Sequence, residues 1–151
     1  MNITLVYEGV MTVPDEAKEG IRVFIGHETD IVVACQKGRD VAARLGFGGG
    51  DQVAIAIAIS EVARNILDHA GQGEILVQTQ IRQEERGSGI VVVARDRGPG
   101  IADVNLALQD GYSTRGSLGV GLPGAKRLMD EIEVVSKVGQ GTTVTMRKWV
   151  S

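Results

Sequence analysis

The sequence predicts an α+β fold, a two-layer α/β sandwich in which helices cover one face of a mixed sheet. Three observations carry this prediction. The length of 151 residues suits one ordinary domain with a single core, two long helical segments occupy the first half, and segments of β character lie before and after them. We expect one domain over residues 21–151 and an N-terminal extension over residues 1–20, to which the sequence assigns no role.

Composition and charge exclude several classes of protein. Hydrophobic residues make up 43% of the chain and charged residues 23%, the usual balance of a folded domain. The longest apolar run, Val53–Ile59, is far shorter than the roughly 20 residues that cross a bilayer, so no membrane partner is expected. A net charge of −3 offers no basic surface for nucleic acid. The single cysteine, Cys35, cannot form an internal disulfide, which fits a cytoplasmic location.

Two short segments near the N-terminus have β character. Ile3–Tyr7 is a candidate strand, and the proline and charges around Pro14 are typical of an exposed connector. Ile21–Ile25 has the β-branched and aromatic content of a short strand. The sequence does not say whether the first of these segments pairs with the sheet.

Two helices follow. Asp30 is the expected N-cap of a helix that runs to about Leu45, where the glycine-rich residues 46–50 end it. Asp51 is the expected N-cap of a second helix of about five turns, which Gly71 ends. The first half of this second helix is apolar nearly all round, so we expect it to be buried on most sides.

The second half of the chain contains four further strand patterns. Residues 74–82 and 89–95 predict two strands joined by a charged turn, and Asp96 closes the second of them. Residues 131–136 and 142–149 alternate like a terminal hairpin.

Glycine is in excess, with 21 in the chain, about twice its usual share. Much of the excess lies in the second half, where a polar, glycine-rich loop covers about residues 109–121. Pro123 suits the first position of a helix ending near Met129. Clustered glycines mark places where the backbone turns sharply or comes close to a ligand, so this loop is a candidate lid.

Glu61 and Asn65 form the first candidate site. They lie four residues apart, on one face of the second helix, and the stripe continues through apolar Ala54, Ile57 and Ala58. One interpretation is structural: the two polar groups bond to backbone or border solvent. The other is chemical, because an asparagine oxygen suits Mg²⁺ and a glutamate can accept a hydroxyl proton. Spacing alone leaves both open.

The DRGPG segment, Asp96 to Gly100, is the second candidate. A turn after a strand explains its proline and glycines without any ligand. In the functional interpretation, Asp96 accepts a hydrogen bond from an exocyclic amine, and Gly98 and Gly100 let the backbone pass close to a flat base.

Two glycine clusters complete the set. The loop in RGSLGVGLPG leads into the helix that is expected to start near Leu122. Its backbone N–H groups can form a cradle for phosphates. Its formal match to G-x-G-x-x-G does not indicate a dinucleotide site, because a polar loop stands where a strand is required. The VGQGTTV segment, taken alone, is a hairpin turn.

The order of these four motifs, E-x-x-x-N, D-x-G-x-G, G-x-G-L and G-x-G-T, resembles the GHKL ATPase superfamily, which includes gyrase, histidine kinases and MutL. Within it, AISEVARNILDHAGQGEI and LPGAKRLMDE are similar to the RsbT family of serine/threonine switch kinases of bacterial stressosomes. The resemblance runs from about Asp30 to the C-terminus. It implies the ATP-binding Bergerat fold, with nucleotide between the helices and a lid.

The resemblance also assigns roles. It implies that Asn65 is the Mg²⁺ ligand, that Glu61 is the base that activates the acceptor hydroxyl, and that Asp96 binds the adenine amino group of ATP. The other positions placed around the nucleotide are Gly98, Gly100 and Thr142 near the base, and Gly119, Val120, Gly121 and Leu122 near the phosphates. Arg115 and Lys126 are our own candidates for offsetting charge on the γ-phosphate.

The function that the resemblance implies is transfer of the ATP γ-phosphoryl group to serine or threonine of STAS-domain proteins, a scaffold and an antagonist. It also implies that the released kinase activates a PP2C-type phosphatase. The alternative is an anti-sigma factor of the RsbW and SpoIIAB type, which sequesters a sigma factor and phosphorylates its STAS-domain antagonist. The nucleotide motifs alone do not separate the two.

Overall fold

The computed structural model describes residues 3–8, 20–82, 87–109 and 121–151. The expected connector around Pro14 and nearly all of the expected lid lie outside these residues. The described elements are β1 (Ile3–Glu8), β2 (Gly20–Ile25), α1 (Glu28–Leu45), α2 (Gly49–Ala70), β3 (Gly73–Arg82), β4 (Gly87–Asp96), α3 (Val104–Ala107), α4 (Gly121–Leu128), β5 (Glu131–Lys137) and β6 (Gly141–Trp149).

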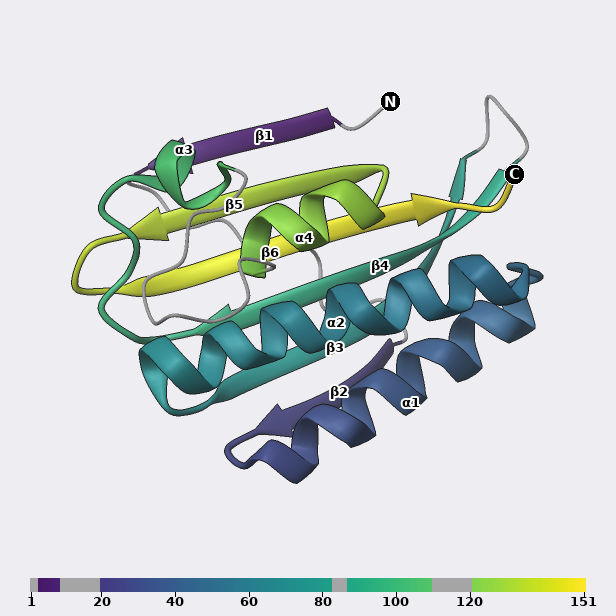
Figure 1. Ribbon diagram of the computed structural model, residues 1–151, viewed down its shortest axis with the longest axis horizontal. Helices are drawn as coiled ribbons and strands as arrows, with labels where there is room; N and C mark the ends of the chain where they lie inside the picture. Colours follow the sequence, from purple (N-terminus) through teal and green to yellow (C-terminus); the bar gives the residue numbers. More distant parts are fainter. Residues whose placement is uncertain (1–2, 9–19, 83–86, 110–120) are drawn as a thin grey trace.

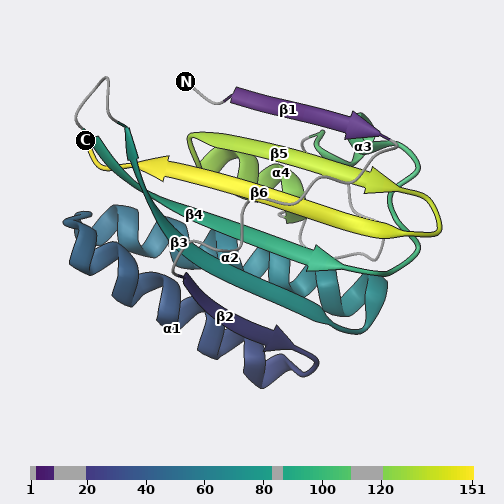
Figure 2. The same cartoon turned by 180° about the vertical axis from the view of Figure 1, so that it is seen from behind.

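The strands form one six-stranded sheet in the order β1-β5-β6-β4-β3-β2. Neighbouring strands are antiparallel except β1 and β5, which run parallel, so the sheet is mixed. Helices α1, α2 and α4 lie on one face of the sheet (Figure 1), and none of the described helices covers the other face (Figure 2). This arrangement confirms the expected two-layer α+β sandwich.

The main core lies between the sheet and the helices. Helix α2 contributes Ile55, Ile59 and Ile66, which are fully buried together with Ile75 of β3 and Val92 of β4. The period-2 pattern of the strands explains this arrangement, because alternate side chains face the helical layer. This packing holds α2 in place against the sheet.

The expectation that the first half of α2 is buried on most sides was wrong. Val53 is 45% exposed and Ile57 is 41% exposed. The reason is the layer architecture: α2 packs on the sheet below it and on α1 beside it, so its outer side faces solvent. An apolar helix segment therefore does not establish burial by itself.

Both long helices begin before the aspartates expected to cap them. Helix α1 follows His27, and the Asp30 carboxylate instead accepts the N–H groups of Gly26 and His27, each at 2.9 Å. Helix α2 follows Gly48, so Asp51 lies in its first turn. A glycine is an acceptable N-cap, and an acid in the first turn is favourable beside the helix N-terminus. The aspartates were assigned to the correct end of each helix but to the wrong position.

Two differences affect the second half of the chain. Helix α4 begins at Gly121, so Pro123 is its third residue and not its first. The one-turn helix α3 was not predicted. The Asp103 side chain caps it by accepting the N–H of Leu106 at 2.9 Å. Such a short helix leaves no 3.6-residue period in the sequence to detect.

Candidate active site

A small pocket lies between α2 and the ends of β4 and β6. Four of the expected site residues line it: Asn65, Asp96, Gly100 and Thr142. The rest of its lining is mostly apolar and consists of Val62, Ile66, His69, Ala94, Pro99, Ile101 and Val144. Because α2 packs on the sheet, its face from Val62 through Asn65 to His69 points toward the DRGPG turn. The fold thus brings together three of the four sequence motifs.

Asp96 lies at the end of β4, and its carboxylate is held by backbone groups. Its Oδ1 accepts the N–H of Gly98 at 2.8 Å. Burial raises the pKa of this carboxyl, and this effect outweighs the hydrogen bonds from Gly98 and Thr142 and the nearby His69, which lower the pKa. A partly desolvated acceptor at a pocket floor suits a hydrogen-bond donor on a flat base.

Adenosine binding is expected to weaken as the pH falls through the raised pKa of Asp96, because a protonated carboxyl is a poorer acceptor for an amino group. The weakening should begin at a higher pH than for an ordinary aspartate, and binding in this window should release a proton. Adenosine carries no phosphate, so calorimetry in two buffers of different ionisation enthalpy measures that proton. A His69→Gln variant serves as a control, because it removes the imidazole that lines the same pocket. Tighter binding at acidic pH would contradict the role of Asp96.

The glycines of the DRGPG turn are required by contacts within the protein. A Cβ at Gly98 would lie 2.6 Å from the Cβ of Ala70 at the end of α2. Gly100 has φ of +79°, and a Cβ there would lie 2.4 Å from the Lys137 carbonyl oxygen. Close approach was expected toward a base. The described close contacts are instead to α2 and to the end of β5 with the turn that follows it. These glycines therefore let the DRGPG turn pack against its neighbours.

Gly100→Ala is expected to lower the free energy of unfolding by more than Gly139→Ala does. Gly139 has a similar φ of +82°, so either alanine costs roughly 1 kcal/mol of backbone strain. Only at Gly100 does the new Cβ also meet backbone, since nothing lies within 4 Å at Gly139. We expect this overpacking to add about 1–3 kcal/mol. Denaturant unfolding of both variants gives the difference, and equal losses would contradict it.

Ser136 was missed by the sequence reasoning, although it organises this end of the pocket. The side chain is 1% exposed, and its Oγ accepts the N–H of Ile101 at 2.7 Å. The same oxygen lies 2.8 Å from Thr142 Oγ1 and donates to the Gly141 carbonyl at 3.2 Å. Ser136 therefore ties the DRGPG turn to the start of β6 and fixes the Thr142 hydroxyl. A serine inside a strand pattern gives no sequence signal for this role.

Glu61 lies one turn before Asn65 on α2 and is not among the residues that line the pocket. Burial raises the pKa of its carboxyl, against a smaller opposing effect of the Arg64 guanidinium. Arg64 itself forms an ion pair with Glu28 at 2.6 Å. A carboxyl with a raised pKa is a candidate for proton transfer.

The phosphate end of the expected site is only partly described. Gly121 and Leu122 begin α4, and the Leu122 side chain is buried, so only its backbone can face a ligand. Lys126 follows one turn later and is half-buried. Neither Leu122 nor Lys126 lines the pocket. Arg115, Gly119 and Val120 lie outside the described residues, so their roles stay predictions.

The possible metal ligands at the pocket fit an ion that binds together with a nucleotide. Among the described residues, no three His, Cys, Asp or Glu side chains are grouped so that they could hold a metal ion. One carboxamide oxygen, from Asn65, lines the pocket. Mg²⁺ in nucleotide sites is usually bound through one or two carboxylates and substrate phosphates, and keeps several waters. The Asn65 oxygen is the protein ligand that this pocket could offer to such an ion.

Comparison with known proteins identifies the family. The family model described as "Histidine kinase-like ATPase domain" matches residues 27–148. The serine/threonine-protein kinase RsbT of Bacillus subtilis (strain 168) is 50% identical over 129 residues, which are 85% of this chain and 95% of RsbT. The anti-sigma F factor of Caldanaerobacter subterraneus subsp. tengcongensis is 36% identical over 99 residues, 64% of this chain and 68% of that relative. The anti-sigma F factor of Thermoanaerobacter sp. (strain X514) is 34% identical over 99 residues.

The chain belongs to the histidine kinase-like ATPases and, among them, to the RsbT type of serine/threonine protein kinase. This confirms the family expected from the four motifs and, with it, the ATP-binding fold. Among the helices that the structure describes, none has both the length and the apolar character needed to cross a membrane.

Proposed function

We propose that this protein transfers the γ-phosphoryl group of Mg²⁺-bound ATP to serine or threonine residues of STAS-domain proteins, a scaffold and an antagonist of a stressosome. We further propose that the kinase, once released from that assembly, binds and activates a PP2C-type phosphatase. The observation that carries the proposal is the pocket shared by Asn65, Asp96, Gly100 and Thr142 in a chain 50% identical to the kinase RsbT.

The side chains that line the pocket suit the chemistry of an adenine base. Asp96 and Thr142 offer oxygen atoms beside apolar side chains such as Val62 and Ile66, which suit a flat ring. The phosphates then extend toward the N-terminus of α4, where Gly121 and Leu122 present backbone N–H groups and where a helix favours anions. Lys126 adds a positive charge on the same helix.

Phosphoryl transfer needs positioning and charge stabilisation more than covalent help from the protein. Asn65 holds Mg²⁺, which neutralises phosphate charge when it is bound. Glu61 accepts the proton of the acceptor hydroxyl as that oxygen forms its bond to the γ-phosphorus, and the bond from this phosphorus to the β–γ bridging oxygen breaks to release ADP. Since these groups act on the hydroxyl and the phosphates and not on the rest of the acceptor, the choice of acceptor falls to protein docking.

The alternative proposal is an anti-sigma factor that sequesters a sigma factor. Its support is the identity of 34–36% to the two anti-sigma F factors over 64% of the chain. The kinase proposal has the stronger support, since the similarity to RsbT is higher and covers more of the chain.

One experiment separates the two proposals. The purified chain is incubated with labelled ATP, Mg²⁺ and the STAS-domain proteins encoded in the same genome, and the labelled residue is identified. A parallel pull-down asks whether the immobilised chain retains STAS-domain proteins or a sigma factor. Labelled serine or threonine with no retained sigma factor supports the kinase proposal. Retention of a sigma factor in place of the STAS-domain proteins would favour the alternative.

A further inference from the structure

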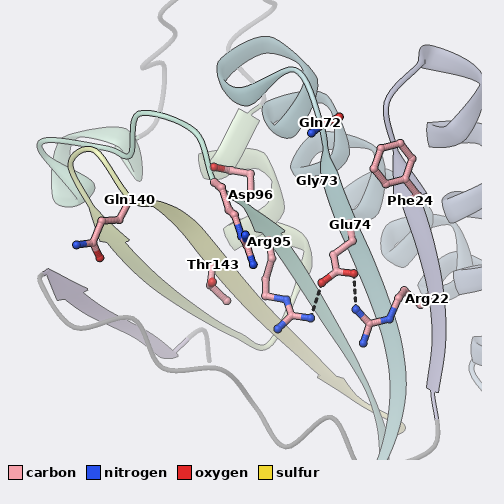
Figure 3. Close-up of a pocket in the computed structure, with 10 residues that line it drawn as sticks. Arg22, Phe24, Gln72, Gly73, Glu74, Arg95, Asp96, Gln140 and Thr143 are labelled. Carbon is pink, nitrogen blue, oxygen red and sulfur yellow. Dashed lines mark hydrogen bonds and ion pairs between the residues drawn. The ribbon is translucent and has the colours of Figure 1, made fainter.

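A second hollow lies on the face of the sheet that the described helices leave uncovered. It has a volume of about 680 Å³ (Figure 3). Its lining includes Arg22 and Phe24 of β2, Glu74 of β3, Arg95 and Asp96 at the end of β4, Arg97 just after it, and Thr143 of β6. We call this hollow the sheet groove. The sequence motifs gave no indication of it, because its residues come from four strands.

The sheet groove and the nucleotide pocket lie back to back. Arg95 pairs with Thr143 across β4 and β6, and Asp96 pairs with Thr142 one position further along. Because successive side chains of a strand point to opposite faces, Arg95 and Thr143 face the groove and Thr142 faces the pocket. Asp96, at the end of β4, lines both. An occupant of the groove therefore covers the opposite face of the sheet and reaches the nucleotide pocket at Asp96.

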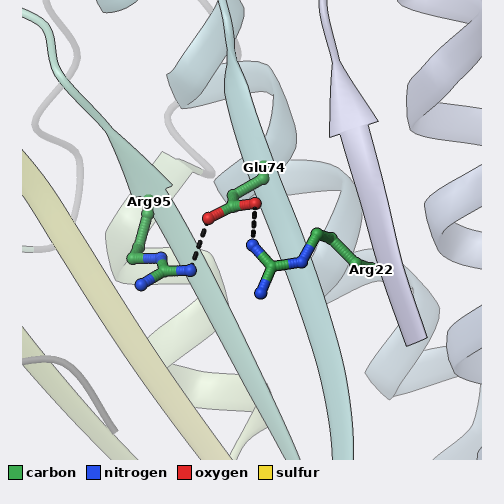
Figure 4. Close-up of polar contacts among 3 residues, drawn as sticks. All are labelled: Arg22, Glu74 and Arg95. Atoms are coloured by element: carbon green, nitrogen blue, oxygen red, sulfur yellow. Dashed lines mark hydrogen bonds and ion pairs between the residues drawn. The ribbon is translucent and has the colours of Figure 1, made fainter. Parts of the chain in front are cut away.

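The sheet groove concentrates positive charge on an acidic protein. One carboxylate, Glu74, forms ion pairs with two guanidinium groups, those of Arg22 and Arg95 (Figure 4). Arg97 is exposed at the rim and forms no ion pair with any residue that the structure describes. Three arginines thus face two carboxylates here, those of Glu74 and Asp96, so the lining is net positive although the whole chain has a net charge of −3.

Two further features describe the partner that the groove would accept. The Phe24 side chain is 60% exposed and offers an aromatic surface. Thr143 is 1% exposed, and its buried hydroxyl has no hydrogen-bond partner among the described residues. An unsatisfied buried hydroxyl costs about 1–3 kcal/mol, so a small adjustment that gives it an acceptor would be favourable. The groove therefore combines hydrogen-bond donors with an apolar contact surface.

The width of the sheet groove favours an extended chain over a small anion. From Arg22 on β2 to Thr143 on β6 the groove crosses three strand spacings, which is about 14 Å, or roughly four residues of extended peptide. A single phosphate or carboxylate cannot reach both ends.

We propose that the sheet groove docks an acidic, extended segment of a partner protein, with carboxylates on the arginines and an apolar side chain on Phe24. This surface lies mainly on the opposite face of the sheet from the nucleotide pocket and shares Asp96 with it. The test below uses no nucleotide, so the proposal and the proposed kinase activity can fail independently.

The test is an NMR titration of the full ¹⁵N-labelled chain with a blocked hexapeptide of four glutamates and two leucines. Amide shifts are expected to concentrate at residues 22–24, 72–74, 95–97 and 140–143. A peptide with glutamine in place of each glutamate should not bind. Inorganic phosphate, titrated over the same range, should not reproduce the shifts.

Three variants sharpen this experiment. Arg97→Gln removes an exposed charge and should weaken peptide binding by roughly three-fold. Glu74→Gln removes the carboxylate that competes for the arginines and should tighten it by a similar factor. Arg39→Gln, an exposed site on α1 in the other layer, should leave it unchanged. Absent shifts, shifts centred on another surface, equal binding of the glutamine peptide, weaker binding by Glu74→Gln or the same shifts with phosphate would each overturn the proposal.

Discussion

Asn65→Ala is expected to abolish Mg²⁺-dependent phosphorylation of the protein substrate, with a loss of at least about 10³-fold. Asn65 is the one carboxamide that lines the pocket among the described residues. Removing it takes away the proposed protein ligand of Mg²⁺ and therefore several kcal/mol of charge stabilisation at the phosphates. The measurement is the initial rate of transfer from labelled ATP to a STAS-domain protein at saturating nucleotide.

Two controls separate the metal role from a loss of structure. Asn65→Asp keeps an oxygen ligand and should retain part of the activity, and a higher Mg²⁺ concentration should raise the rate of the aspartate variant further. Gln36→Ala removes an exposed amide on α1, far from the pocket. The Nε2 of Gln36 donates a hydrogen bond to the Asp40 carboxylate at 3.0 Å. That variant should transfer at the normal rate. An Asn65→Ala protein with a normal rate would remove Asn65 from the proposed mechanism.

The fold was predictable because its signals are local. Periodicity and turn residues located both long helices and every described strand, and Gly46 and Gly71 end the helices in the left-handed conformation expected of C-terminal glycines. The pairing of β1 with β5 was not predictable, because it joins residues 3–8 to residues 131–136, and no local pattern encodes so distant a partner. The helix starts were misplaced for a different reason: residues other than aspartate occupy the capping positions, His27 before α1 and Gly48 before α2.

The candidate site was predictable only as a set of motifs. The order of the motifs brought Asn65, Asp96, Gly100 and Thr142 to attention, and the structure places these four around one pocket. Their supports were not predictable. Ser136 acts through hydrogen bonds to groups that only folding brings near, and Gly100 is required by a carbonyl on another strand. The sheet groove was missed because Arg22, Glu74 and Arg95 come from three strands and form no sequence motif.

Glu61→Gln is expected to leave ATP binding nearly unchanged while it slows phosphoryl transfer by at least about 10²-fold, the scale of a general base. The amide has almost the same shape as the carboxylate but cannot take up the hydroxyl proton. Glu61 does not line the pocket, so the affinity for nucleotide should not depend on it. Calorimetry with ATP and a transfer assay on the same preparation separate the two effects.

The pH profile supplies a second, independent readout of the same variant. Burial raises the pKa of Glu61, and only the ionised carboxylate acts as a base. The wild-type rate should therefore rise with pH through this raised pKa and level off above it. Glu61→Gln should lose this limb of the profile, whereas Glu133→Gln on β5 should keep it. If this limb of the pH profile persists in Glu61→Gln with an unchanged maximal rate, another group accepts the proton. Asn65 would then be the one residue of this helix face that takes part in transfer.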